Sequence, residues 1–153
     1  MTVIRQEDFV QSIADALQYI SYYHPPDFIQ AMDQAYEKEQ NPAAKDALAQ
    51  ILINSRLCAE GHRPVCQDTG IVTVFLKIGM AVIWQTKSSV SIADMVNEGV
   101  RLAYRNPDNI LRASIVLDPM GQRINTQDNT PAVIHMELVP GSTVSVDIAA
   151  KGG

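Results

Sequence analysis

The stretch Cys58-Ala59-Glu60-Gly61-His62-Arg63-Pro64-Val65-Cys66-Gln67-Asp68-Thr69-Gly70 lies where the pattern of the chain changes. Before it, apolar residues fall three or four apart, which is the spacing of helices with one buried face. After it, residues 71–78 are rich in Val, Ile and Phe, a composition that favours a strand. This order predicts an α+β protein, with N-terminal helices followed by a mostly antiparallel or mixed sheet.

Three helices are expected before this stretch. The first covers residues 3–23 and ends at a His-Pro-Pro sequence. The second covers about residues 27–40. The third follows Asn41, a good N-cap residue, and Pro42, which suits the first helical position. We expect the third helix to end near residues 58–61.

The C-terminal side is expected to hold strands and one interposed helix. Strands are predicted at residues 71–78 and 81–84, as a pair, and at 111–117, 133–139 and 143–150. The helix begins after Ser91, with Asp94 placed as in a capping box, and a Pro-Gly-Ser turn is expected to close a hairpin between the last two strands. Neither a repeat nor a linker interrupts the chain, so residues 1–153 are predicted to form a single domain.

Composition narrows the classes of function. The 153 residues are 46% hydrophobic and 19% charged, which fits a globular protein with a sizeable core. The net charge of -5 and the lack of a basic patch argue against nucleic acid or an anionic membrane as partner. The N-terminus lacks the pattern of a secretory signal, and no apolar stretch is long enough for a membrane span. We therefore expect a cytoplasmic protein.

The densest group of reactive side chains lies in the quoted stretch. Cys66, Gln67 and Asp68 are adjacent, and the following Thr69 and Gly70 give the backbone a tight bend. A thiolate can hold a metal, an amide can orient a carboxylate or hydroxyl, and a carboxylate can move a proton. The pattern alone is also compatible with a small buried cysteine followed by an ordinary turn.

Two other kinds of site use residues of the types found in this stretch. Cys58, His62 and Cys66 could bind zinc in a small interaction domain, but close cysteine pairs and a fourth ligand are missing. Asp-Thr-Gly also occurs in aspartic proteases, which need that Asp repeated in a second lobe or subunit. The preceding Cys-Gln does not fit that family, and we disfavour both hypotheses.

The quoted stretch is followed, in order, by residues 97–101 (Asn-Glu-Gly-Val-Arg), 109–114 (Asn-Ile-Leu-Arg-Ala-Ser), 128–135 (Asp-Asn-Thr-Pro-Ala-Val-Ile-His) and 149–153 (Ala-Ala-Lys-Gly-Gly). Together these five motif segments resemble the iron-sulfur-dependent class I fumarate hydratases and their tartrate dehydratase relatives. That family adds water reversibly to a dicarboxylic alkene on a 4Fe-4S cluster held by three cysteines. The resemblance implies a hydro-lyase that interconverts fumarate and malate, a step of the tricarboxylic acid cycle, or that dehydrates tartrate.

The resemblance also implies roles for individual residues. Cys66 matches the first of the three cluster cysteines. Gln67 and Asp68 match residues that contact the substrate, and Asp68 is a candidate for catalytic proton transfer. Arg112 matches a substrate-binding arginine, whose planar guanidinium suits a carboxylate.

The remaining matches concern backbone and structural positions. Gly152 and Gly153 match the start of a glycine-rich loop whose backbone amides approach the substrate. His62 and His135 are expected to be structural, and Asn129-Thr130-Pro131 is expected to form a turn. Cys58 does not match a cluster ligand, and we expect it to pack at the end of a helix.

In the family, the other two cluster cysteines and the base that removes the carbon-bound proton lie beyond the glycine-rich loop. No residue follows Gly153 in the sequence. We therefore expect an N-terminal fragment of a larger hydro-lyase that alone holds no stable cluster and is inactive. Its partners would be the remainder of its own chain, a dicarboxylate substrate and further copies in a homo-oligomer. The alternative is a stand-alone binding or regulatory module that keeps the fold without catalysis.

Overall fold

The computed structural model describes residues 2–67, 69–87 and 89–152. The chain divides into two compact units, a larger one formed by Met1–Gln18 with Gln67–Gly153 and a smaller one formed by Tyr19–Cys66. Each unit is described by itself. The assignment of residues 1–153 to one domain stays a prediction.

The larger unit is built around strand β2 (Ile71–Gly79). β2 lies between β6 (Val133–Val139), which runs parallel to it, and β7 (Val144–Lys151), which runs antiparallel. Every second residue of β2 is buried, because successive side chains of a strand point to opposite faces of the sheet. These residues are Val72, Val74, Leu76 and Ile78.

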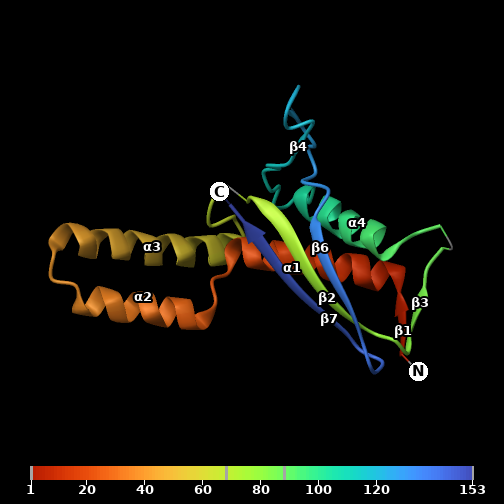
Figure 1. Ribbon diagram of the computed structural model, residues 1–153. Helices are drawn as coiled ribbons and strands as arrows, with labels where there is room; N and C mark the ends of the chain where they lie inside the picture. Colours follow the sequence, from red (N-terminus) through yellow and green to blue (C-terminus); the bar gives the residue numbers. More distant parts are fainter. Residues whose placement is uncertain (1, 68, 88, 153) are drawn as a thin grey trace. The chain divides into compact units, whose positions relative to one another are not determined.

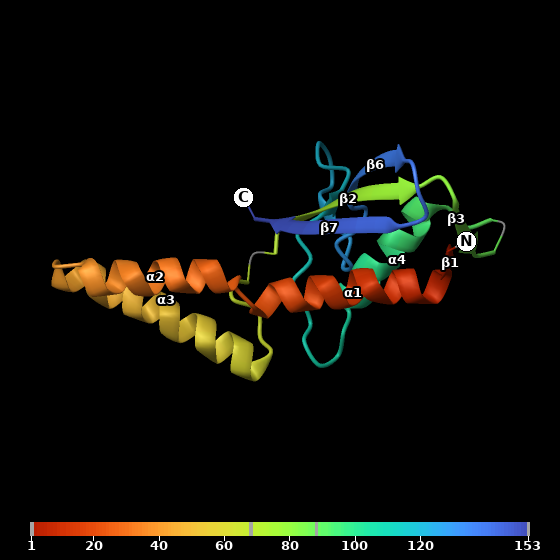
Figure 2. The same ribbon diagram turned by 90° about the horizontal axis from the view of Figure 1, so that it is seen from below.

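Two helices cover the buried face of this sheet. They are α1 (Gln6–Tyr22), whose residues up to Gln18 belong to this unit, and α4 (Ile92–Tyr104). Figure 1 and Figure 2 show both helices on one side of β6, β2 and β7. Their apolar residues form the core together with β2: Phe9, Val10, Ile13, Ala14, Leu17, Met95, Val96, Val100, Ala103 and Tyr104.

Short strands complete the larger unit. β1 (Thr2–Arg5) pairs in parallel with β3 (Val82–Gln85), and β4 (Val116–Leu117) pairs antiparallel with β5 (Ile124–Asn125). The predicted α+β class is confirmed, with N-terminal helices, a mixed sheet and α4 interposed among the strands. The predicted capping box at the start of α4 is also confirmed, since Ser91 Oγ accepts from Asp94 N and Asp94 Oδ2 accepts from Ser91 N.

The smaller unit is a helical hairpin. It consists of α2 (Pro26–Lys38) and α3 (Pro42–Gly61), which lie side by side in Figure 1. The predicted N-cap of α3 is confirmed, because the Asn41 side chain accepts hydrogen bonds from two backbone amides of the first turn. α3 ends at Gly61 and is capped by His62, which adopts the left-handed conformation with φ 48°. Among the described residues, no helix combines the length and apolar character needed to cross a membrane.

The prediction of helix from residue 3 is wrong at its start. Residues 2–5 form β1, and α1 begins only at Gln6. The β-branched Thr2, Val3 and Ile4 favour a strand, and β3 supplies the parallel partner that satisfies their backbone groups. The two strands predicted at residues 71–78 and 81–84 both form, as β2 and β3, and β3 pairs with β1.

The predicted hairpin between the last two strands is also wrong. β6 and β7 do form, but β2 lies between them. The turn that joins them crosses the end of β2, where Gly79 N donates to Thr143 O at 2.8 Å and Ala81 N donates to Gly141 O at 2.9 Å. The turn residues thus bind the end of a third strand, a long-range contact that turn chemistry does not reveal.

The predicted strand at residues 111–117 shortens to β4. Side chains bind several backbone groups of the preceding residues, and Ile115 O accepts from the backbone N of Thr126 at 3.0 Å. Asn125 Nδ2 donates to Ala113 O at 2.8 Å, and the amides of Ser114 and Ile115 donate to the side chain of Asn129. Residues 111–115 therefore lie outside the strands.

We expect Gly99→Ala to destabilise the larger unit, because Gly99 of α4 lies directly against α1. A Cβ atom at Gly99 would lie 2.6 Å from Ile13 Cβ and 2.7 Å from Val10 O. The variant should lose about 1–3 kcal/mol of unfolding free energy in urea denaturation. Gly61→Ala is the control, because a Cβ there would meet only Arg63 Cγ, at 3.7 Å. Equal losses in the two variants would contradict the prediction.

Candidate active site

All five motif segments contribute residues to the larger unit, the first of them through residues 67–70. They meet near the start of β2. The register pairs Ile71 with Lys151 of β7 and Thr73 with Val133 of β6. The residues before β2, those before β6 and those after β7 therefore lie at the same end of the sheet.

Asn129 joins three chain segments at this end. Its side chain is fully buried, with 0% exposure. Oδ1 accepts hydrogen bonds from Ser114 N at 2.6 Å and Ile115 N at 3.1 Å, while Nδ2 donates to Gly70 O at 2.9 Å. Asn129 has φ 59°, in the left-handed region that asparagine tolerates better than most residues. A neutral amide suits this position because it both accepts and donates.

Gly70 brings the loop before β2 against the end of β7. Its φ is 63°, and a Cβ atom there would lie 1.7 Å from Lys151 O and 2.3 Å from Gly152 N. No side chain fits in this space. Next to it, Thr69 Oγ1 donates a short hydrogen bond to Arg112 O at 2.5 Å. The loop therefore contacts the backbone of both Arg112 and Gly152, two of the predicted substrate-binding residues.

The stretch that carries Arg112 is held at both ends by buried amides. At its start, Asn109 Nδ2 donates to Gln18 Oε1 of α1 at 2.8 Å, and Gln18 Nε2 donates to Asn109 O at 3.0 Å. At its end, Asn129 accepts from Ser114. Asn109, Gln18 and Asn129 are all buried. The position of the Arg112 backbone is thus fixed from two sides.

The Arg112 side chain is exposed and lines a groove of about 490 Å³. Among the described residues, no hydrogen bond or ion pair engages its guanidinium. Within residues 2–67, 69–87 and 89–152, the groove wall carries two guanidinium groups and two side-chain amides and no carboxylate, which suits an anionic ligand. Its residues are Tyr104, Arg105, Ile110, Leu111, Arg112, Ala113, Asn125 and Gln127.

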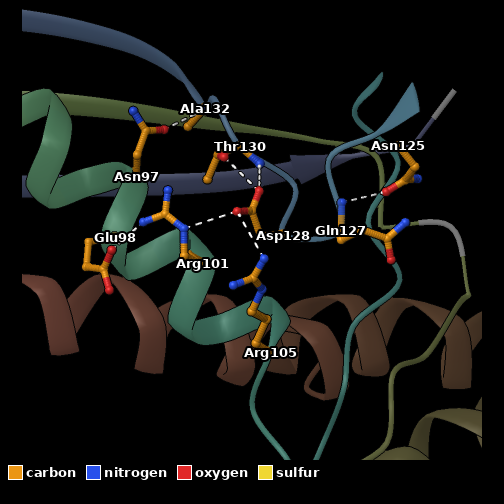
Figure 3. A network of polar contacts seen from close by, with 9 residues as sticks. All are labelled: Asn97, Glu98, Arg101, Arg105, Asn125, Gln127, Asp128, Thr130 and Ala132. Carbon is orange, nitrogen blue, oxygen red and sulfur yellow. Dashed lines mark hydrogen bonds and ion pairs between the residues drawn. The ribbon is translucent and has the colours of Figure 1, made fainter. Parts of the chain in front are cut away.

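A polar network anchors the turn before β6 to α4 (Figure 3). Asp128 Oδ2 accepts from Arg101 Nε at 3.0 Å and lies 3.6 Å from Arg105 Nη2. Asp128 Oδ1 accepts from the backbone N of Thr130 at 3.0 Å and from its Oγ1 at 2.7 Å. Arg101 also pairs with Glu98. The turn is thus tied to the helix on one side by Asp128 and to the loop before β2 by its neighbour Asn129.

The surroundings of Asp128 set its charge state. Burial raises the pKa of this carboxyl, but hydrogen bonds from Thr130 and the contact with Arg101 outweigh that effect and hold the pKa below its usual value. Asp128 therefore stays ionised at neutral pH and binds Arg101 as a carboxylate. On the same helix, Asn97 Oδ1 accepts from Ala132 N at 2.9 Å, which adds a second tie to the turn.

The structure separates the predicted site residues into three groups. Asp68 and Gly153 lie outside the described residues. Gln67, Arg112 and Gly152 are exposed residues of the larger unit, and Cys66 is an exposed residue of the smaller unit. Sequence reasoning took Asn129 only for part of a turn and did not single out Arg101 or Asp128 for a role of their own. The one signal for Asn129 was its place in an Asn-Thr-Pro sequence within a motif segment.

The cluster implied by the resemblance needs three cysteine ligands. Neither Cys58 nor Cys66 forms a disulfide. Cys58 is buried near the end of α3, where its thiol lies 3.6 Å from Asn54 Oδ1 and from Pro64 O. Within the described ranges, no three His, Cys, Asp or Glu residues lie together as a metal site needs, so Cys58, His62 and Cys66 form none. The described residues offer one exposed thiol and do not complete a cluster site.

Comparisons with known proteins agree with this arrangement of motif segments. The model of the family described as fumarate hydratase (fumerase) matches residues 10–153. A Methanocaldococcus jannaschii protein provisionally named L(+)-tartrate dehydratase subunit alpha is 33% identical over 91 residues, which are 60% of this chain and 31% of the relative. The anaerobic class I fumarate hydratase of Escherichia coli strain K12 is 30% identical over 118 residues, 77% of this chain and 21% of the relative.

Fumarate hydratase 2 of Leishmania major is 28% identical over 135 residues, 88% of this chain and 23% of that protein. The chain thus spans about a third or less of the length of these relatives. It is an α+β protein whose motif segments converge at one end of a mixed sheet. It belongs to the fumarate hydratase (fumerase) family, and the resemblance read from the sequence is confirmed.

We expect the two arginines around Asp128 to contribute unequally to stability. Arg101 is nearer to the carboxylate and less exposed, at 36% against 56% for Arg105. Methionine keeps the apolar stem of either side chain. Arg101→Met should lower the unfolding free energy at neutral pH by about 1 kcal/mol, and Arg105→Met by less than about 0.5 kcal/mol.

The difference between these two variants should depend on pH. The pKa of Asp128 is lower in the folded chain than in the unfolded chain, so its contribution is present above the ordinary Asp range. It is lost as the pH falls through the lowered pKa. Urea denaturation at pH 7 and below about pH 4 should therefore show the gap closing in acid. A gap that persists unchanged there would contradict the assignment to Asp128.

Proposed function

We propose that this chain is the N-terminal part of a hydro-lyase that reversibly hydrates fumarate to malate or dehydrates tartrate. The observation that carries the proposal is the convergence of the motif segments at the start of β2, beside the groove that Arg112 lines. Membership of the fumarate hydratase family supports it. The proposed partners are a small dicarboxylate, the remainder of the chain and further copies in a homo-oligomer, in the cytoplasm.

Each proposed substrate contact follows from the chemistry of its group. The Arg112 guanidinium binds a carboxylate of the substrate through two parallel N–H donors. Gln67 orients a carboxylate or hydroxyl through its amide. Gly152 and Gly153 offer backbone N–H groups where no side chain blocks their approach. Asp68 moves the proton to or from the departing water, since a carboxylate within reach can act as acid or base.

The proposed cofactor is a 4Fe-4S cluster in the assembled enzyme, and Cys66 is the ligand that this chain contributes. Such a cluster supplies a Lewis acid that polarises the bound substrate. Cys66 meets the first requirement of a ligand, because its thiol-bearing side chain is exposed. Two further cysteines would come from the remainder of the enzyme. The 153-residue chain alone is therefore proposed to hold no stable cluster.

Removal of the acid-base group should lower turnover. Asp68→Asn in the assembled enzyme is expected to reduce kcat for malate dehydration or fumarate hydration at least about a hundredfold, because the amide cannot exchange the proton. Asp33→Asn, an exposed aspartate of α2, is the control and should leave kcat unchanged. The absorbance of fumarate follows the reaction. Normal turnover in Asp68→Asn would exclude the proposed role.

The same assay on the 153-residue chain alone, after anaerobic iron-sulfur reconstitution, should give no activity. Robust hydratase activity of the isolated chain would overturn the fragment part of the proposal.

Removal of the thiol ligand should affect the cluster directly. Cys66→Ala in the assembled enzyme is expected to lose bound iron and sulfide together with the visible absorbance of the cluster. Cys58→Ala is the matched control, because Cys58 is buried among protein atoms of its own unit and should not be a ligand. Chemical analysis of iron and sulfide in both proteins makes the comparison. Cluster loss in Cys58→Ala with retention in Cys66→Ala would reverse the assignment.

A further inference from the structure

We propose that Asn129 is a positioning residue, which sets the end of the loop before β2, at Gly70, and the Arg112 stretch in the geometry that binds substrate. The inference rests on the proposed function, because it concerns the same site. Asn129 is 0% exposed and is absent from the wall of the Arg112 groove. It therefore acts through the residues that it holds, without touching a ligand in that groove.

The partners of Asn129 define what it positions. Gly70, whose carbonyl receives the Nδ2 hydrogen bond, is the last residue of the loop that carries Gln67 and Asp68. Ser114, whose amide binds Oδ1, lies two residues after Arg112. One side chain thus links the two segments that carry the proposed substrate contacts. Replacing it with an apolar residue would remove a hydrogen bond from the backbone of each segment.

The hydrogen bond of Thr69 supports this assignment. Thr69 Oγ1 donates to Arg112 O, so the loop and the Arg112 stretch also meet directly. That contact involves a side chain which is only partly buried, whereas the Asn129 contacts lie in the interior. We therefore assign the fixed geometry of the two segments to Asn129, with Thr69 as a second and more exposed contact.

The competing reading is that Asn129 only stabilises the fold, and Asn129→Asp separates the two. Aspartate tolerates the left-handed φ and keeps two oxygens to accept from Ser114 N and Ile115 N. As a carboxylate it has no hydrogen to donate to Gly70 O. The variant therefore removes the hydrogen bond to Gly70 O and keeps the hydrogen bonds from Ser114 N and Ile115 N.

Amide hydrogen exchange in the isotope-labelled chain measures both links separately. At neutral pH, Asn129→Asp should speed exchange of the Gly70 and Ile71 amides about tenfold and leave Ser114 and Ile115 within about twofold of the unmodified chain. Below the pKa of the introduced carboxyl group, a proton becomes available for Gly70 O, and exchange of the loop should slow again. A residue that only stabilised the fold would change all four amides together.

Asn97→Asp is the matched control. It makes the same chemical change on α4, where Oδ1 accepts from Ala132 N. In the described part of the chain, no hydrogen bond joins Asn97 to Gly70. Asn97→Asp should leave exchange at Gly70 and Ile71 unchanged at every pH. The proposal is overturned if Asn97→Asp speeds exchange of the loop as much as Asn129→Asp does, or if Asn129→Asp leaves the loop unchanged.

Two further measurements test the proposal if Asn129→Asp fails to fold. In the unmodified chain, the Nδ2 protons of Asn129 should exchange slowly and show nuclear Overhauser contacts to Gly70; fast exchange without such contacts would overturn the proposal. Asn129→Gly relieves the backbone conformation and removes every side-chain bond, so it should loosen both segments about equally. If hydrogen exchange in Asn129→Gly became faster in only one of the two segments, that result would also contradict the proposal.

In the assembled enzyme, Asn129→Asp should lower kcat/KM about tenfold, with a thermal midpoint close to that of the unmodified protein. Unchanged kcat/KM in an active enzyme would refute the positioning role. An unmodified enzyme without any hydro-lyase activity would refute the proposed function instead. The exchange measurements would still decide whether Asn129 links the two segments.

Discussion

The rest of the larger unit depends on the pairing of β2 on both sides. β2 has no free edge along most of its length, and alternate side chains pack against α1 and α4. Since each of its neighbours has a fixed register, any shift of β2 by one residue would move its buried residues to the open face of the sheet. The helices, the two outer strands and the loop before β2 are all positioned relative to this one strand.

The topology around β2 explains why distant motif segments meet. β6 runs parallel to β2, so the residues before each strand lie at the same end of the sheet. β7 runs antiparallel, so the residues after β7 lie there too. Gly70, the turn 128–132 and Gly152 thus come together through strand order alone. The Arg112 stretch is then held at this end by buried amide side chains.

The sequence predicts the local features of this fold better than the long-range ones. Asn41 and Ser91 were identified as N-caps because capping depends on residues within one turn. The position of β2 between β6 and β7 was missed, because a Pro-Gly-Ser turn has the same composition whether its strands pair or enclose a third. Arg112 was identified only by resemblance, since an arginine in an extended stretch has no distinctive pattern. Asn129 was missed because its partners lie 59, 15 and 14 residues away.

Two adjacent residues of the turn before β6, Asp128 and Asn129, hold different parts of the structure because one is charged and the other neutral. Asp128 is charged and faces Arg101 of α4, whose partial exposure keeps the desolvation cost of the pair moderate. Asn129 is neutral and fully buried, where a charge would cost far more and where both a donor and an acceptor are needed. If the sequence were Asn-Asp instead of Asp-Asn, a carboxylate would be buried against the Gly70 carbonyl and Arg101 would face an amide. The order Asp-Asn is therefore the one that ties α4 to the turn and the turn to the loop before β2.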